Sequence, residues 1–241
     1  MNTLPLWHLH ALALFAVIIL PVSAWAATDG IKIGDASISF PDSGALVRSR
    51  NNDVLHFAQT TMAPKKRLLA IWVDRSQPAV KSTYFPTHYR YADAYTMRGL
   101  EQLDASTANF SEVKDMVRGE INQAKGTTNI LMPRDLDELQ SKLRKMHIDP
   151  ERGFSLGVIS TTMIRNDSHA LSNLVLGSIA SNDSTSVVPK RWLLMCTNVL
   201  LIRKKIVTLN VFSEFTRPDD RKWVEVECKS LVGAMLSANS F

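Results

Sequence analysis

Four stretches in the C-terminal half of the chain are rich in apolar and β-branched residues and have the length of strands. They comprise residues 154–164, 169–180, 192–202 and 206–215, and short polar segments divide them. Runs of this composition between turn residues are typical of strands. Consecutive strands with short connections pair antiparallel with their neighbours. The pattern therefore predicts a four-stranded antiparallel meander.

The segment that follows the meander has the periodicity of an amphipathic helix. Apolar residues recur every three or four positions between residues 219 and 237, namely Val224, Cys228, Leu231, Val232 and Met235. A single apolar stripe on a helix has to be buried against another element. Because the meander lies directly before it in the chain, we expect this helix to cover one face of the sheet.

Shorter elements of mixed type are predicted upstream. Alternation around Gly34-Asp35 predicts a short hairpin or one bent strand over residues 29–40, and the apolar run 67–73 predicts a buried central strand. Helical spacing predicts helices over residues 51–62, 109–124 and 133–146. The even spacing of three tyrosines favours a strand over residues 89–97. Together these elements predict an α+β fold in which helices cover an antiparallel meander sheet.

The most apolar stretch of the chain lies at its N-terminus. Residues 11–20 form an unbroken apolar run, and Pro21 ends it. The small residues Ala24 and Ala26 then occupy the two positions that a signal peptidase must accommodate. This layout is typical of a secretory signal peptide.

The predicted signal peptide spans residues 1–26 and is cleaved between Ala26 and Ala27, which leaves a single α/β domain over residues 27–241. An uncleaved membrane anchor is the alternative. We favour cleavage because the apolar run is shorter than the ~20 residues that cross a bilayer comfortably. We therefore expect a periplasmic or secreted protein of a bacterial envelope, with no stable membrane span after signal removal.

The exported domain is predicted to be basic. The chain has a formal net charge of +5, and residues 1–26 contain none of its charged side chains. A basic protein favours acidic partners, here another protein or an anionic component of the envelope. Export makes nucleic acid an unexpected partner. Basic residues cluster at 65–67, 142–145 and 203–205, where we favour solvated turns and helix faces over a binding patch.

Two cysteines, Cys196 and Cys228, are the only ones in the chain. A two-residue turn at Lys204-Lys205 would pair Cys196 with Ser213 and place it on the buried face of the meander, while Cys228 would point inward from the closing helix. A disulfide between strand and helix is one reading in an oxidising compartment, worth ~2–4 kcal/mol. Two buried thiols that never meet are the other.

One motif suggests catalysis. The segment Gly153-Phe154-Ser155-Leu156-Gly157 matches the G-x-S-x-G nucleophile elbow, and Asp167 and His169 would be the partners of Ser155. The elbow requires a strand before the serine and a helix after it, whereas here a proline turn precedes it and β-branched residues follow. We therefore favour a non-enzymatic protein and keep a secreted serine hydrolase as the alternative.

No other pattern indicates a chemical site. The histidines lack metal-ligand spacing, and neither a phosphate-binding loop nor a dinucleotide fingerprint occurs, so we expect no metal and no cofactor. Tyrosines gather within residues 84–95 and could line a ligand groove, although cross-strand packing is the simpler explanation.

The element order resembles one known family. A leading strand that ends in Ile38-Ser39-Phe40-Pro41, mixed helices, and a four-stranded meander closed by a C-terminal helix are similar to the Mog1/PsbP-like proteins. The resemblance implies an α/β/α sandwich. It also implies a binding or accessory role in envelope complexes, because those proteins are mostly non-catalytic. We accordingly expect an exported non-enzymatic binding protein, of which an immunity protein or an accessory protein is a specific form.

Overall fold

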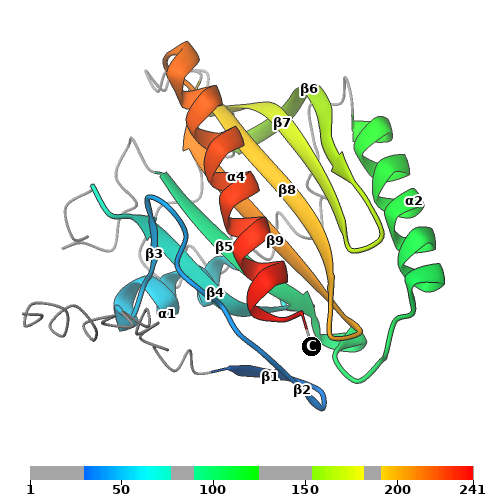
Figure 1. Cartoon of the computed structure of the whole chain (residues 1–241). Helices are drawn as coiled ribbons and strands as arrows, with labels where there is room; N and C mark the ends of the chain where they lie inside the picture. The colour runs from blue at the N-terminus through cyan, green and yellow to red at the C-terminus, as the bar shows by residue number, and fades with distance from the viewer. Residues whose placement is uncertain (1–29, 77–89, 125–153, 182–190, 241) are drawn as a thin grey trace, which may run out of the picture.

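A seven-stranded antiparallel sheet forms the centre of the structure (Figure 1). The computed structural model describes residues 30–76, 90–124, 154–181 and 191–240. In their order across the sheet, the strands are β3 (Leu46–Arg48), β4 (Lys66–Asp74), β5 (Arg90–Met97), β9 (Lys205–Glu214), β8 (Arg191–Ile202), β7 (Ala170–Ser181) and β6 (Phe154–Asn166). A separate hairpin consists of β1 (Ile31–Ile33) and β2 (Ala36–Ile38). The helices are α1 (Asn52–Thr61), η1 (Arg98–Leu100), α2 (Thr107–Ala124) and α4 (Pro218–Ala238).

The predicted meander is confirmed, with one correction at its last turn. Strands β6, β7, β8 and β9 are neighbours in sequence order and all pair antiparallel. The turn between β8 and β9 is Arg203-Lys204, not Lys204-Lys205, so Cys196 pairs with Val211 rather than with Ser213. Since side chains alternate with a period of two, this register difference of two residues leaves each side chain on its predicted face.

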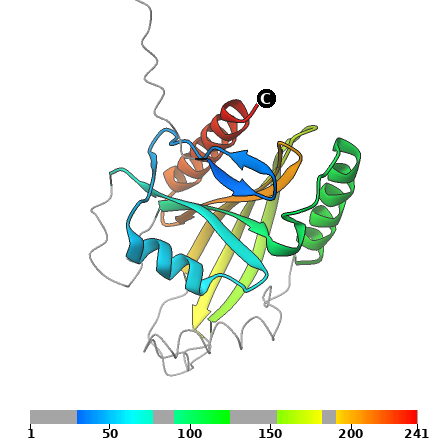
Figure 2. The same cartoon turned by 90° about the horizontal axis from the view of Figure 1, so that it is seen from below.

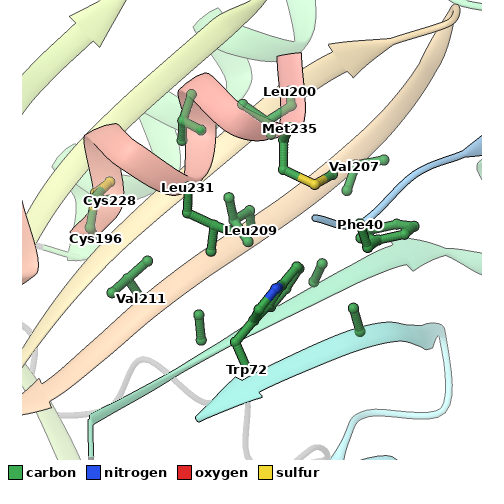
Figure 3. Close-up of a cluster of buried hydrophobic side chains, with 14 of the residues drawn as sticks. Phe40, Trp72, Cys196, Leu200, Val207, Leu209, Val211, Cys228, Leu231 and Met235 are labelled. Atoms are coloured by element: carbon green, nitrogen blue, oxygen red, sulfur yellow. A yellow bond between two sulfur atoms is a disulfide. The ribbon is translucent and has the colours of Figure 1, made fainter. Parts of the chain in front are cut away.

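The C-terminal helix covers one face of the sheet, as its apolar stripe predicts (Figure 1). All five residues of that stripe are buried in the main core cluster. Figure 3 shows Leu231 and Met235 of α4 above Leu209 and Val211 of β9. Burial of one large aliphatic side chain contributes about 1.5–3 kcal/mol, so this helix accounts for much of the stability of the sheet.

A disulfide joins this helix to the sheet. Cys196 of β8 and Cys228 of α4 are bonded, with Cα atoms 6.2 Å apart, and both are buried (Figure 3). The fully buried Asn198 lies beside the bridge and donates hydrogen bonds to the carbonyl oxygens of Cys196 and Leu209. The sequence left open whether the two cysteines are bonded or remain separate thiols, and the structure contains the disulfide.

The opposite face carries the other two long helices (Figure 2). Phe110 of α2 is fully buried against Val199 and Leu201, which alternate with the residues that face α4. Helix α1 packs on β4 near the edge of the sheet. Helices α1 and α2 thus lie over different strands of this face, α1 over β4 and α2 over β8.

The N-terminal elements agree in type with the prediction. The hairpin turns at Gly34, whose φ of 58° lies in the left-handed region that glycine tolerates. The apolar run forms β4, which pairs on both sides but lies next to the edge strand rather than at the centre. The three-residue strand β3 was not predicted, because it is too short to show a period.

The structure thus confirms the coarse fold class, a mixed α+β fold built on a mostly antiparallel sheet. The predicted helix at 133–146 and the signal peptide, with Ala26 and Ala27, lie outside the described residues. Among the helices that the structure describes, none is both long enough and apolar enough to span a membrane.

Candidate functional site

A cavity of about 940 Å³ lies at the end of the sheet where two hairpin turns meet two helix ends. Its walls come from the β6–β7 turn, the β8–β9 turn, the N-terminus of α2 and the C-terminus of α4. We call it the hairpin-end cavity. In Figure 1 these four segments converge at the end of the sheet near the C-terminus of the chain.

The β8–β9 turn brings two cations to the hairpin-end cavity. Arg203 and Lys204 have φ values of 48° and 64°, so both adopt the left-handed conformation of a tight hairpin turn. That conformation costs an ordinary residue roughly 1–2 kcal/mol, and Asn-Gly is the preferred pair in such turns. The sequence therefore keeps two basic residues here at the expense of backbone stability.

These two cations are only weakly neutralised. Arg203 donates one hydrogen bond to the carbonyl oxygen of Ser37 and forms no ion pair within the described part of the chain. Lys204 has 73% of its side chain exposed and lies 3.8 Å from Asp104. Asp104 is engaged more closely by Lys205, at 2.7 Å. Both cations therefore keep donors that face solvent and the cavity.

Lys205 corrects the expectation of a solvated basic turn. Its side chain is 2% exposed, and its ammonium group lies 2.7 Å from Asp104 and 2.8 Å from Asp35. The hydrogen bond that Lys205 donates to Asp104, followed by the one it donates to Asp35, raises the pKa of Lys205, so it remains charged. Lys205 offsets one of the two negative charges of Asp35 and Asp104. Lys204 contacts Asp104 at a longer 3.8 Å, and Arg203 forms no ion pair among the described residues.

The N-terminus of α2 adds partial positive charge to the same wall. Ser106 caps the helix: its hydroxyl accepts a hydrogen bond from the Asn109 amide, and the Asn109 side chain accepts one from the Ser106 amide. This reciprocal cap leaves the amides of Thr107 and Ala108, which have no partner within a helix. Such amides and the helix dipole favour an anion.

The β6–β7 turn supplies Arg165, Asp167 and His169 to the cavity. Burial alone would raise the pKa of Asp167, but hydrogen bonds from the His169 amide and from Arg165 hold it below its ordinary value. Its carboxylate therefore stays ionised and organises the turn. The His169 ring contacts the Ser168 hydroxyl at 2.8 Å rather than a carboxylate.

Ser155 does not join these residues. Its backbone lies at the start of β6, paired with Ala180, whereas Asp167 and His169 follow the other end of that strand. At about 3.3 Å per residue, the strand separates Ser155 from Asp167 by roughly 40 Å. The segment around Ser155 is extended and continues as a strand, not as the helix that an elbow requires.

Sequence reasoning named Asp167 and His169 as partners of Ser155, and it placed Arg203 and Lys204 in a basic cluster that it interpreted as a solvated turn; all four residues line the cavity. The pair Arg203-Lys204 is unusual in a two-residue hairpin turn, where Asn-Gly is preferred, and this unusual choice could have marked the turn as a functional position. No sequence pattern indicates that this turn lies beside the N-terminus of α2. Within the described ranges, no group of histidine, cysteine and acidic side chains could hold a metal ion.

Comparisons with known protein families and with curated proteins found no match for this chain.

Proposed function

We propose that this chain is an exported, non-enzymatic protein that binds an anionic group in the hairpin-end cavity. The group is a carboxylate or phosphate, carried by an acidic envelope component or by an acidic partner protein. The single observation that supports this proposal most is the pair Arg203 and Lys204, two weakly neutralised cations held in a strained turn beside a helix N-terminus.

We also propose that the chain is related to the Mog1/PsbP-like family. A leading hairpin, helices on both sheet faces and a meander closed by α4 support a Mog1/PsbP-like α/β/α sandwich. Members of that group serve mostly as binding or accessory subunits, which agrees with a basic cavity. An immunity or accessory role in a bacterial envelope is the form that we propose.

Exchanging the turn for Asn-Gly tests the cavity directly. The variant Arg203→Asn/Lys204→Gly removes two charges and relieves two left-handed residues, so we expect a higher Tm. We also expect its affinity for phosphatidylglycerol vesicles to fall by about tenfold to thirtyfold, at ~1 kcal/mol per cation. The control variant Lys222→Ala/Lys229→Ala removes the same charge from exposed positions on α4 and should bind like the wild type.

The protein-partner form is tested in cells by a photo-crosslinking residue at position 204, with position 222 as the control site. An adduct with one envelope protein at 204 and none at 222 supports that form. The hairpin-end cavity is not the binding site if two results are obtained together: the turn variant binds vesicles as tightly as the control variant, and position 204 gives no crosslinked adduct that position 222 lacks.

Export is tested separately by fractionation and mass measurement. We expect the protein in the periplasm or the medium with Ala27 as its first residue. A full-length protein in the cytosol would refute the exported role.

A further inference from the structure

Two exposed leucines share one turn beside the hairpin-end cavity. Leu100 ends η1, and the amide of Leu103 donates a hydrogen bond to the Leu100 carbonyl oxygen at 3.1 Å. Leu103 is 59% exposed and Leu100 is 38% exposed. Single exposed leucines are ordinary on a protein surface, but two on one turn form a small apolar patch. We call residues 100–103 the leucine turn.

Basic residues flank the leucine turn on both sides. On one side, the Arg98 amide donates to the carbonyl oxygen of Lys65 at 2.8 Å. On the other side, the Ala105 amide donates to the carbonyl oxygen of Lys204, also at 2.8 Å. Each leucine is two residues from one of these contacts, so its backbone lies within about 7 Å of it. Figure 1 places the η1–α2 connection and the β8–β9 turn at the same end of the sheet, and Figure 2 views that end from below.

Positive charge is in excess around the leucine turn. The carboxylate of Glu101 lies 3.0 Å from Arg67. The ammonium group of Lys205 lies within 2.8 Å of both Asp35 and Asp104. Other cations at this end are exposed and have no ion pair with any described residue, namely Lys32, Lys65, Arg98 and Arg203. The surface therefore attracts anions, and its cations surround an apolar centre.

We propose that the leucine turn docks the protein on the surface of an anionic lipid bilayer, with a lipid phosphate in the hairpin-end cavity. This inference rests on the proposed function, because it assigns the bound anionic group to a phospholipid headgroup. In such a contact, the leucine side chains enter the boundary between headgroups and acyl chains, and the cations around them meet the headgroup phosphates. The protein lies on the bilayer and does not span it.

The composition of this surface favours a bilayer over a protein partner. Protein interfaces are enriched in aromatic residues, and charged residues are depleted at their centre. The leucine turn contains no aromatic residue, and basic residues flank it directly in space. Apolar side chains between Lys and Arg are instead typical of segments that bind the interface of an anionic membrane.

The variant Leu103→Gln tests membrane docking by co-sedimentation with phosphatidylglycerol vesicles. We expect its affinity for these vesicles to fall by about tenfold, because an exposed leucine no longer leaves water on binding. Leu103→Trp, which keeps a residue that favours the membrane interface, should bind at least as tightly as the wild type. Phosphatidylcholine vesicles, which carry no net charge, should bind the wild type at least about tenfold more weakly.

The control Met116→Gln makes the same kind of change at a matched position. Met116 is 58% exposed and lies on α2, away from the leucine turn. We expect this variant to bind phosphatidylglycerol vesicles like the wild type. Because both substituted side chains are exposed, Leu103→Gln and Met116→Gln should have the Tm of the wild type.

A soluble headgroup separates membrane docking from the anion site. Glycerol 3-phosphate should shift the NMR signal of the Thr107 amide equally in the wild type and in Leu103→Gln, because Thr107 lines the cavity and Leu103 does not. A signal that shifts in neither protein would overturn the anion site itself, whatever the vesicles show.

The vesicle comparison decides membrane docking. The proposal is overturned if Leu103→Gln binds phosphatidylglycerol vesicles as tightly as Met116→Gln, or if the wild type does not bind them. A photo-crosslinking residue at position 103 that captures one envelope protein in cells, with no vesicle binding, would assign the leucine turn to a protein partner instead.

Discussion

Reduction of the Cys196–Cys228 disulfide should destabilise the protein by a predictable amount. The two cysteines are 32 residues apart in sequence, so the bond closes a loop of about 33 residues in the unfolded chain. The loop-closure relation gives an entropy of about 12 cal/mol/K for that loop, or about 3.7 kcal/mol at 25 °C. This loss is a large share of the 5–15 kcal/mol that typically stabilises a domain.

A hydrogen bond to Asn198 should offset part of the stability that is lost when the disulfide is reduced. Its Oδ1 atom lies 3.3 Å from the sulfur of Cys228 and 3.7 Å from that of Cys196, and its amide group is fixed by two backbone carbonyls. Once reduction lets the two sulfurs move apart, a thiol can donate to this oxygen, which recovers about 0.5–1 kcal/mol. We therefore expect a net destabilisation of about 3 kcal/mol.

Urea denaturation with and without dithiothreitol measures the effect, because the free energy of unfolding extrapolates linearly to water. The double variant Cys196→Ala/Cys228→Ala serves as the control, and its stability must not respond to the reductant. Two results would refute the reasoning: a difference below about 0.5 kcal/mol between oxidised and reduced wild type, or alkylation of both thiols in the unreduced protein. Asn198→Leu should widen the gap between the oxidised and reduced forms.

Three further predictions concern single side chains. Asp220→Asn should destabilise the protein by about 2 kcal/mol at pH 7 and have almost no effect near pH 2. Burial alone would raise the pKa of Asp220, but hydrogen bonds from Thr216 and Arg90 outweigh it and lower the pKa to about 2. Chemical denaturation should therefore show the stabilisation by the Asp220 carboxylate disappearing as the pH falls from 4 to 2. Asp93→Asn should stabilise by up to about 3 kcal/mol above pH 6 and not below pH 4. Burial raises the pKa of Asp93 to about 6, so the cost of ionising it develops between those pH values. An unchanged difference across this range would contradict the assignment. Ser106→Ala should cost about 1 kcal/mol through loss of the α2 cap, measured by thermal unfolding, whereas Ser106→Asn should restore it.

Most helices and strands could be predicted from local patterns. The stripe on α4 and the alternation in β8 and β9 are properties of consecutive residues, and burial of one face enforces them. The turn between β8 and β9 was placed one residue late, because Arg203, Lys204 and Lys205 are chemically alike in sequence. The structure distinguishes them, since Lys205 alone is buried beside Asp35 and Asp104.

The pairing of β5 with β9 was beyond local patterns. These strands are separated by more than a hundred residues, yet they are neighbours in the sheet and create the Asp93–Asn210 pair. Both strands contain several polar residues, and the sequence gives no sign that Asp93 and Asn210 meet. The hairpin-end cavity depends on contacts of this kind, since it joins Arg203 to the end of α2.

The sequence alone determined the antiparallel meander, its closing helix and the basic character of the chain, because hydrophobic periodicity and charge are read from neighbours along the backbone. Only the tertiary structure decided which strands are adjacent and which lysine is buried. Those properties depend on the register between distant strands, and a chain that satisfies the same local periodicities can adopt more than one such register.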